Sequence, residues 1–285
     1  SFFLPILSDN FPNGITKKVK FFKNFDYKVL NNFHRVCRVR KKDTTRDITE
    51  LNYSKNSNKI VVGKTHYDKP SLICCYENDF RFNKDINIPL YEFLTVINSY
   101  NKKLPLITFK ENKLILKYSS FTQSIVLPKF NDEYLKSIPK LDENKIDFSF
   151  KLNNDFFKNL ERIRLKLRHK HSFDITAFYS LNNKLFFTNI KRPNLKSRKG
   201  GLRSYSFEID VETDKRFTVR LDSDQLKFLS KFFISDYEVT SYDNRKYLVF
   251  KNIYKPLTYI LFLKGKAVEP KPTPDSNKKE ENTNA

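Results

Sequence analysis

A unit of one amphipathic helix followed by three short apolar strands occurs twice in this chain, and it constrains the fold more than any other feature. Residues 87–128 place apolar side chains at the spacing of one helix face and then form three runs rich in Ile, Leu, Phe and Tyr, which is typical of a β-meander. Residues 219–264 repeat this order at an offset of roughly 135 residues, a repeat on the scale of a domain. The matching helix positions are Leu90, Phe93 and Ile97 in the first copy and Leu226, Leu229 and Phe233 in the second.

Each half of the chain also begins with a second amphipathic helix. We predict these helices over residues 25–36 and 155–166, about 130 residues apart. Antiparallel strands complete both halves, with a turn predicted at residues 64–70 and a hairpin around Asn182–Asn183. The sequence therefore predicts an α+β protein of two similar domains, each with two helices packed on antiparallel sheets. The alternative is that two unrelated αβ stretches share this order by chance.

Composition divides the chain into five segments. Residues 1–20, with two prolines, a glycine and a basic run, are predicted to be an irregular N-terminal extension. Residues 129–145 have mixed charge and few apolar side chains, which predicts an extended connector between domains. Residues 265–285 lack apolar periodicity and are predicted to be a disordered tail. The two predicted domains are then residues 21–128 and 146–264.

The charge of the chain is strongly positive. It carries 54 Lys and Arg residues against 32 Asp and Glu, a formal net charge of +22, which favours polyanions such as nucleic acid or an anionic membrane surface. No apolar run approaches the roughly 18 residues of a membrane helix, so we expect no membrane partner. Basic side chains gather on helix faces opposite the apolar stripes, where they either contact phosphates or are simply solvated. The candidate DNA-binding residues are Lys28, Arg35, Arg38, Lys102, Lys158, Arg162, Lys166, Lys227 and Lys231.

Sequence signatures of catalysis are missing. The chain has no Gly-rich phosphate loop, no nucleophile-elbow pattern and no paired His at metal-ligand spacing. Cys37, Cys74 and Cys75 are odd in number and two of them are adjacent, which predicts no disulfide framework and fits a reducing compartment. Cys74 and Cys75 lie in an apolar run and are predicted to be packed thiols rather than ligands. We therefore predict a protein that is not an enzyme, with no catalytic residue, metal or cofactor.

Two similar domains with positive helix faces are suited to a ring. Helices could line a central hole while the sheets form the outer wall, and six such domains would enclose a DNA duplex if three chains assembled. Contacts with phosphates hold DNA without reading its bases, which sliding along DNA requires.

Four runs in residues 86–127 read Leu-Tyr-Glu-Phe-Leu-Thr-Val-Ile, Ile-Thr-Phe, Lys-Leu-Ile-Leu and Ser-Ile-Val-Leu-Pro. In pattern and order they resemble the sliding clamps of T-even-type tailed phages. Residues 173–189 and the closing meander are similar to the second domain of that family, so that the resemblance spans residues 24–264. It implies a DNA-clamp fold and a homotrimeric ring around double-stranded DNA, opened by an ATP-driven clamp loader. It also implies a viral protein in the cytoplasm of the host cell that tethers the DNA polymerase, and sometimes the transcription machinery.

In this family a short apolar tail of a partner usually binds near the connector and the last strands. By position, the resemblance implies a partner-binding site here, and the alternative is that the same residues only close the core of the second domain. The chain departs from the family in its high positive charge, its N-terminal extension and its tail, which leaves room for further DNA contacts or an adapted role. The implied partner-binding residues are Tyr134, Leu135, Ile138, Tyr259 and Leu261.

Two other functions also agree with the sequence. One is a basic single-stranded nucleic-acid-binding protein of a viral replication complex, in which the abundant Tyr and Phe side chains stack on bases. Most of these aromatic residues lie at core-periodic positions, however. The other is a structural protein of a virion or replication complex that uses the fold without encircling DNA.

Overall fold

The computed structural model describes residues 27–37, 50–66, 69–77, 84–99, 105–164, 175–191, 203–213 and 215–263. Up to the end of the connector, its elements are α1 (Tyr27–Cys37), β1 (Glu50–Ser54), β2 (Lys59–His66), β3 (Lys69–Glu77), β4 (Ile86–Pro89), α2 (Leu90–Ser99), β5 (Leu106–Lys110), β6 (Lys113–Lys117), β7 (Thr122–Val126), α3 (Glu133–Lys136) and the 3-10 turn η1 (Glu143–Lys145). The remaining elements are β8 (Ile146–Leu152), α4 (Asn154–Arg164), β9 (Ile175–Leu181), β10 (Lys184–Lys191), β11 (Arg203–Glu212), β12 (Thr218–Leu221), α5 (Ser223–Leu229), β13 (Tyr237–Tyr242), β14 (Tyr247–Asn252) and β15 (Leu257–Phe262).

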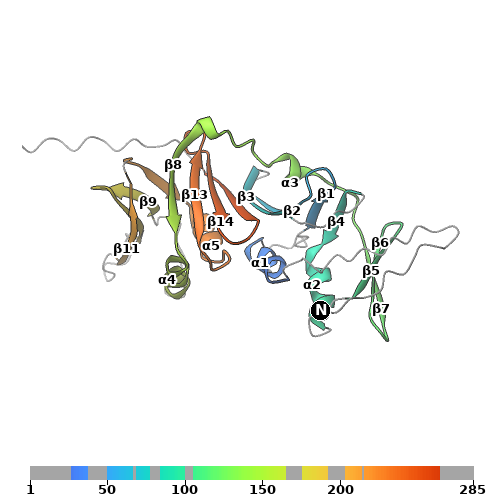
Figure 1. Cartoon of the computed structure of the whole chain (residues 1–285). Coiled ribbons are helices and arrows are strands. Elements are labelled where there is room, and N and C mark those ends of the chain that lie inside the picture. Colours follow the sequence, from blue (N-terminus) through green and yellow to red (C-terminus); the bar gives the residue numbers. More distant parts are fainter. Residues whose placement is uncertain are drawn as a thin grey trace, which may run out of the picture.

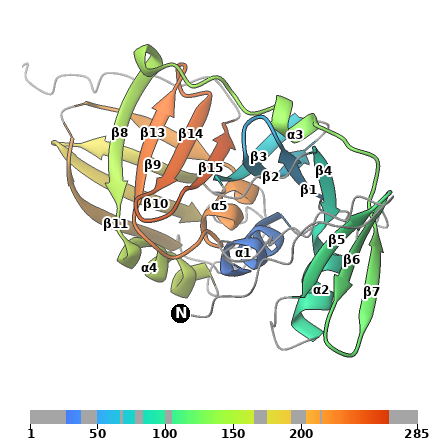
Figure 2. The same cartoon turned by 45° about the vertical axis from the view of Figure 1, so that its right-hand side comes forward.

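The strands form three antiparallel sheets. An eight-stranded sheet has the order β4-β1-β2-β3-β15-β14-β13-β8, and it is flanked by the sheets β11-β10-β9-β12 and β5-β6-β7. The two smaller sheets lie at opposite ends of the molecule, while α1, α2, α4 and α5 lie on one side of the strands and α3 on the other (Figures 1 and 2). We call these two sides the helix side and the outer side.

The predicted repeat is present in the structure. Helix α2 with β5, β6 and β7 corresponds to α5 with β13, β14 and β15, and α1 corresponds to α4. The structure adds a finer repeat that sequence analysis did not find, because α1 and α4 are also each followed by three antiparallel strands. The chain is therefore α+β with two similar halves, as predicted. The residue boundaries of the two domains stay predictions, and the predicted N-terminal extension and tail lie outside the described residues.

The helices form where apolar residues recur every three or four positions, and each buries that stripe on the sheets. Helix α1 buries Val29, Leu30, Phe33 and Val36, and the other long helices bury equivalent stripes in the same continuous core. Helix α5 begins with a capping box, in which the side chain of Asp222 accepts from the backbone N–H of Gln225 at 2.8 Å and the side chain of Gln225 accepts from that of Asp222 at 3.0 Å.

The two halves are joined by direct pairing of β3 with β15. Residues Leu257–Leu261 of β15 pair in antiparallel register with Leu72–Tyr76 of β3. On the helix side of this junction, the hydroxyl of the fully buried Tyr259 accepts from Nδ2 of Asn32 at 2.7 Å and from the backbone N–H of Phe233 at 3.3 Å. One buried tyrosine thus connects α1 of the first half with the segment after α5 of the second.

Several predicted loops contain regular structure. The turn predicted at residues 64–70 is largely wrong, because β2 continues to His66 and β3 already starts at Lys69. The connector predicted as extended contains α3 and η1, and the short strands β1 and β4 were not predicted. The hairpin around Asn182–Asn183 is confirmed, with left-handed φ values of 51° and 61° that Asn tolerates better than most residues.

We predict that Tyr259→Phe lowers the free energy of unfolding by about 1–3 kcal/mol, because it leaves the donors of Asn32 and Phe233 without their buried acceptor. Urea unfolding followed by far-UV circular dichroism measures the change. The matched control is Tyr247→Phe on the outer side, where the side chain is only partly buried, and its effect should stay within about 0.5 kcal/mol. Equal effects of the two substitutions would contradict the assigned role of the Tyr259 hydroxyl.

Candidate nucleic-acid interface

Three helices present basic side chains away from the core on the helix side. Lys28 and Arg35 are exposed on α1, Lys158 and Arg162 on α4, and Lys227 on α5. The apolar stripes hold each helix against the sheets, so these charged positions face outward. Five of the nine residues predicted from sequence to bind DNA therefore lie on one side of the molecule.

The ends of two helices fix the orientation of these faces. The backbone N–H of Asn154 at the start of α4 donates to Oδ1 of Asp236 at 2.7 Å, and that of Phe156 donates to Oδ1 of Asn153 at 3.0 Å. Gln225 in the first turn of α5 donates through Nε2 to the carbonyl of Phe262 at 2.7 Å, which attaches α5 to the end of β15.

The other predicted DNA-binding residues are placed differently. Lys231 lies beyond the end of α5, is only partly exposed, and donates through Nζ to the backbone carbonyl of Arg35 at 3.3 Å. Arg38, Lys102 and Lys166 lie outside the described residues. Helix α2 has no Lys or Arg in its span, and its exposed residues include Tyr91 at 53% exposure, Glu92 and Asn98. Among the described helices on the helix side, the positive charge is thus carried by α1, α4 and α5.

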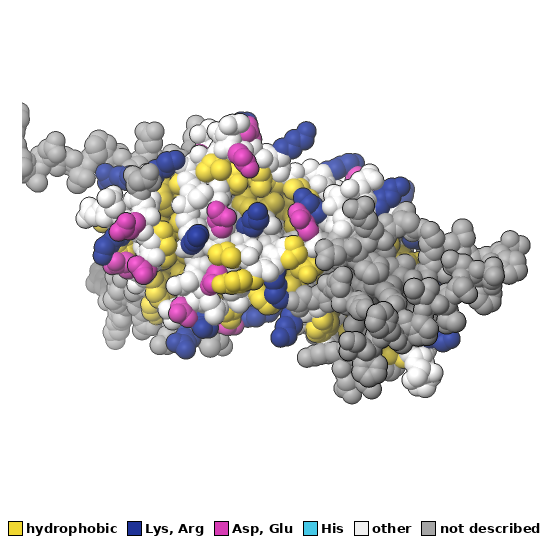
Figure 3. Space-filling model, in the orientation of Figure 1, with side chains coloured by type: hydrophobic (Ala, Val, Ile, Leu, Met, Phe, Trp, Pro, Cys, Tyr) yellow, Lys and Arg dark blue, Asp and Glu magenta, His cyan; other side chains and the backbone are white. Residues whose placement is uncertain are grey.

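Carboxylates accompany most of these cations. Nη2 of Arg35 lies 2.9 Å from Oε1 of Glu161, so that α1 of one half is paired with α4 of the other. Lys158 pairs with Asp155 at 3.1 Å and Lys227 with Asp224 at 2.9 Å, each three residues earlier on the same helix. Exposed pairs of this kind contribute only about 0–1 kcal/mol, so a phosphate can replace the carboxylate at little cost. Figure 3 shows the same mixture on the face seen in Figure 1, where basic and acidic side chains are interspersed.

The pairing of Arg35 with Glu161 could not be found from sequence. The two residues are 126 positions apart, and no local pattern links them. The pairs within α4 and α5 were visible as i, i+3 spacings of opposite charge, a signal that sequence analysis did not use.

The outer side carries a second candidate site, made of apolar residues. Val61, Ile73, Cys75, Val249 and Ile260 form a buried cluster that crosses the β3·β15 junction, and we call it the outer apolar cluster. Three of the implied partner-binding residues, Tyr134, Leu135 and Ile138 of the connector, pack against it and are partly buried. Burial raises the pKa of Tyr134 to about 12 and that of the Cys75 thiol to about 12.

The other two implied partner-binding residues, Tyr259 and Leu261, do not lie on this outer surface but in the core. Both side chains are fully buried on the helix side, because alternate residues of a strand point to opposite faces. Their neighbours Ile260 and Phe262 are the residues of β15 that reach the outer side. The alternation of β15 was readable in the sequence, but which set faced outward depended on the pairing with β3.

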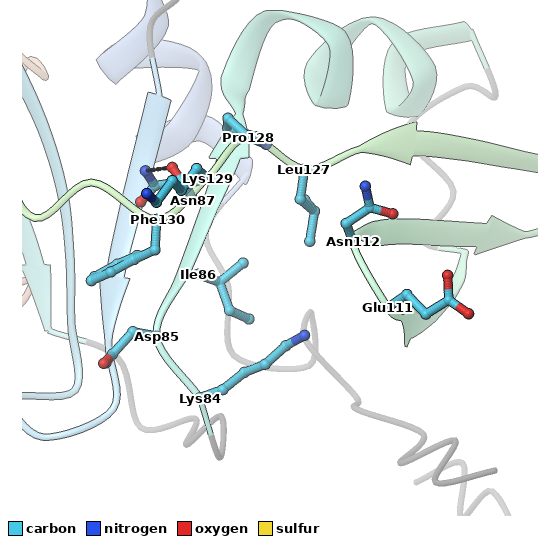
Figure 4. Close-up of a pocket in the computed structure, with 10 residues that line it drawn as sticks. All are labelled: Lys84, Asp85, Ile86, Asn87, Glu111, Asn112, Leu127, Pro128, Lys129 and Phe130. Carbon is cyan, nitrogen blue, oxygen red and sulfur yellow. Dashed lines mark hydrogen bonds between the residues drawn. The ribbon is translucent and has the colours of Figure 1, made fainter.

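A pocket of about 370 Å³ lies where the connector leaves β7. In Figure 4 the side chains of Ile86 and Leu127 point into it, and the ammonium group of Lys84 reaches towards them. It is lined by Lys84, Asp85, Ile86, Asn87, Glu111, Asn112, Leu127, Pro128, Lys129 and Phe130. This lining contains no thiol, imidazole or hydroxyl nucleophile.

Metal-ligand clusters and membrane-spanning helices are both absent from the described part of the chain. Its His, Cys, Asp and Glu side chains do not form a group of three or more that could hold a metal ion. Its helices are all too short or too polar to cross a membrane. All three cysteines are free, buried thiols, as predicted for Cys74 and Cys75, and Sγ of Cys37 lies 3.8 Å from Sγ of Cys74.

Comparison with known proteins identifies the fold. No family model matches the sequence, and no curated protein matches it. Among solved structures, the β clamp of Helicobacter pylori in complex with diflunisal is similar with a TM-score of 0.61 at 14% identity, covering 92% of this chain and 69% of that chain. The same clamp bound to a DNA ligase peptide gives a TM-score of 0.56 at 13% identity, covering 92% of this chain and 68% of that chain.

The DnaN sliding clamp (DNA polymerase III subunit β) of Pseudomonas aeruginosa bound to griselimycin gives a TM-score of 0.55 at 13% identity. The match covers 85% of this chain and 63% of that clamp, so this chain spans less than two thirds of its length. These likenesses show that the chain has the sliding-clamp fold.

We predict that Glu161→Gln raises the affinity for duplex DNA about fivefold at low salt, because it frees Arg35 from its carboxylate. Fluorescence anisotropy with a labelled duplex over a salt series measures it, and the slope of log K against log salt should steepen by up to about 0.9. Asp243→Asn is the matched control, since Asp243 pairs with Lys246 at 2.8 Å in the turn between β13 and β14, next to η1 and away from the helices. An equal gain from both variants would show that only net charge matters and would contradict an interface on the helix side.

Proposed function

We propose that this chain is a subunit of a DNA sliding clamp, a ring-forming processivity factor that encircles duplex DNA and is not an enzyme. The observation that carries the proposal is the sliding-clamp fold combined with exposed basic residues on α1, α4 and α5, all on the helix side. Side chains that hold phosphates without reading bases suit a protein that must move along any sequence.

The free strand edges support closure of such a ring. Strand β11 ends one sheet and β7 ends another, at opposite ends of the molecule (Figures 1 and 2). In the internal repeat, β11 corresponds to β3 and β7 corresponds to β15, and β3 pairs with β15 within the chain. Pairing of β11 with β7 of the next copy would repeat that junction between subunits and cover both of these edges.

Charge also favours this head-to-tail contact. Glu208 and Asp210 are exposed on β11, whereas Lys113 and Lys117 are exposed on β6 beside β7. Antiparallel pairing of the two edges would bring an acidic strand next to a basic sheet. With two similar domains in each chain, three chains would supply the six domains of a closed ring.

We also propose the partners that such a ring needs. They are double-stranded DNA, a clamp loader that opens the ring, and the DNA polymerase that the ring tethers, as in the T-even-type phage clamps that the sequence resembles. The cytoplasm of a host cell is the proposed location. A solved clamp of similar fold is bound to a DNA ligase peptide, and the outer apolar cluster with Tyr134, Leu135 and Ile138 is our proposed site for a partner's apolar tail.

The test of encirclement is topological. Loaded onto a nicked circular plasmid with a cognate loader, the protein should remain bound through gel filtration at high salt, and cutting the plasmid once should release it. Retention after linearisation, or loss from the circle at high salt, would contradict the proposal. The second of these outcomes is expected of the groove-type single-stranded nucleic-acid-binding protein, whose contacts are purely ionic and stacking.

A second test addresses assembly. Native mass spectrometry should give three times the chain mass of 34.0 kDa. Asp210→Lys on β11 should raise the concentration needed for assembly about tenfold, because each contact would then place like charges together. Glu238→Lys is the matched control, since this exposed carboxylate lies on β13 inside the eight-stranded sheet. An unchanged trimer in Asp210→Lys would remove β11 from the contact.

A further inference from the structure

The outer apolar cluster extends beyond the part that the connector covers. Val61 and Cys75 lie on β2 and β3, whereas Ile260 and Val249 lie on β15 and β14 across the junction of the halves. Tyr242, Tyr247 and Phe262 continue it over β13–β15 and are partly buried. Helix α3 lies over β1 and β2, at the other end of this surface.

The aromatic ring of Tyr134 holds α3 in its place. Gly63 lies on the outer face of β2 beside Val61, and a methyl group at this position would overlap the ring of Tyr134. The backbone of Gly63 is not left-handed, so the glycine is needed here for space rather than for conformation. The missing side chain of Gly63 therefore leaves a slot on the sheet, and the ring of Tyr134 fills it.

The attachment of α3 to the sheet is apolar. Within the described part of the chain, every hydrogen bond of residues 130–141 joins members of that segment to each other, including the donation of the Ser137 hydroxyl to the carbonyl of Glu133. Lys136 likewise pairs with Asp132 inside the segment. None of the four residues of α3 is fully buried. Release of α3 would therefore break no hydrogen bond to the sheet, and the side chains of the cover that would leave it, Tyr134, Leu135 and Ile138, are themselves only partly buried.

We propose that α3 is a removable cover of the outer apolar cluster, and that a partner segment carrying an aromatic side chain binds by replacing Tyr134 in the slot above Gly63. This inference rests on the proposed function for the identity of the partner, but not for the opening of the cover. The slot above Gly63 fits an aromatic ring, because the ring of Tyr134 already occupies it. The cover keeps an apolar surface out of water until a segment of matching chemistry competes for it.

The native cysteines allow the cover to be tested without DNA. Cys75 lies under the outer side, whereas Cys37 and Cys74 are buried in the core on the helix side. We predict that Tyr134→Ala and Gly63→Ala each increase the rate of Cys75 alkylation by iodoacetamide at least tenfold, with Cys37 and Cys74 unchanged. Fragment-ion mass spectrometry distinguishes the adjacent cysteines. Tyr134→Phe, which keeps the ring, and Lys136→Ala, which changes an exposed side chain of α3, should both react like the wild-type protein.

A peptide with the sequence of residues 131–139 tests the replacement step. Added to the Tyr134→Ala protein, it should slow Cys75 alkylation towards the wild-type rate, and the same peptide with its tyrosine changed to alanine should not. The proposal is overturned if Cys75 reacts at the wild-type rate in both variants, if all three cysteines accelerate together, or if the two peptides protect equally. If the protein fails the plasmid test but behaves as predicted here, the proposed clamp function is contradicted while the removable cover is retained.

Discussion

The antiparallel ladder between β3 and β15 is the interaction on which the rest of the structure depends. It turns two similar halves into one eight-stranded sheet, so that both surfaces of that sheet are continuous across the junction. On the helix side this continuity lets Tyr259 bond to Asn32 of the other half and sets α1 beside α4. On the outer side it produces the apolar cluster that receives the connector. Both candidate sites therefore exist only because the two halves share strands.

The parts of the fold that could be predicted from sequence are those set by local periodicity. Helices α1, α2, α4 and α5 and the meanders after α2 and α5 repeat apolar residues at spacings that suit one secondary structure each. The short strands β1 and β4 gave too few residues for a pattern, and α3 has only four. Its two apolar side chains, Tyr134 and Leu135, are too few to define a helix face.

The site was less predictable because it depends on pairing between distant segments. Whether Tyr259 or Ile260 faces outward is decided by the register of β15 against β3, and a shift of one residue exchanges the two faces. Likewise, charge and helix face identify Arg35 in the sequence as a candidate DNA-binding residue, but the carboxylate with which it pairs, that of Glu161, comes from the other half. Charge and periodicity locate a face, whereas tertiary contacts decide what each residue on that face does.

For the sliding clamp that we propose, the carboxylates beside Arg35, Lys158 and Lys227 would have a consequence for movement along DNA. Each of these cations has a negatively charged neighbour within 3.1 Å to which it can return when a phosphate departs. When the contact moves from one phosphate to the next, the cation would pair with its carboxylate in between. The binding energy would then vary little with position along the duplex. Carboxylates that compete with phosphates for the same cations would thus let the protein move easily along DNA, even though the chain has a large excess of lysine and arginine.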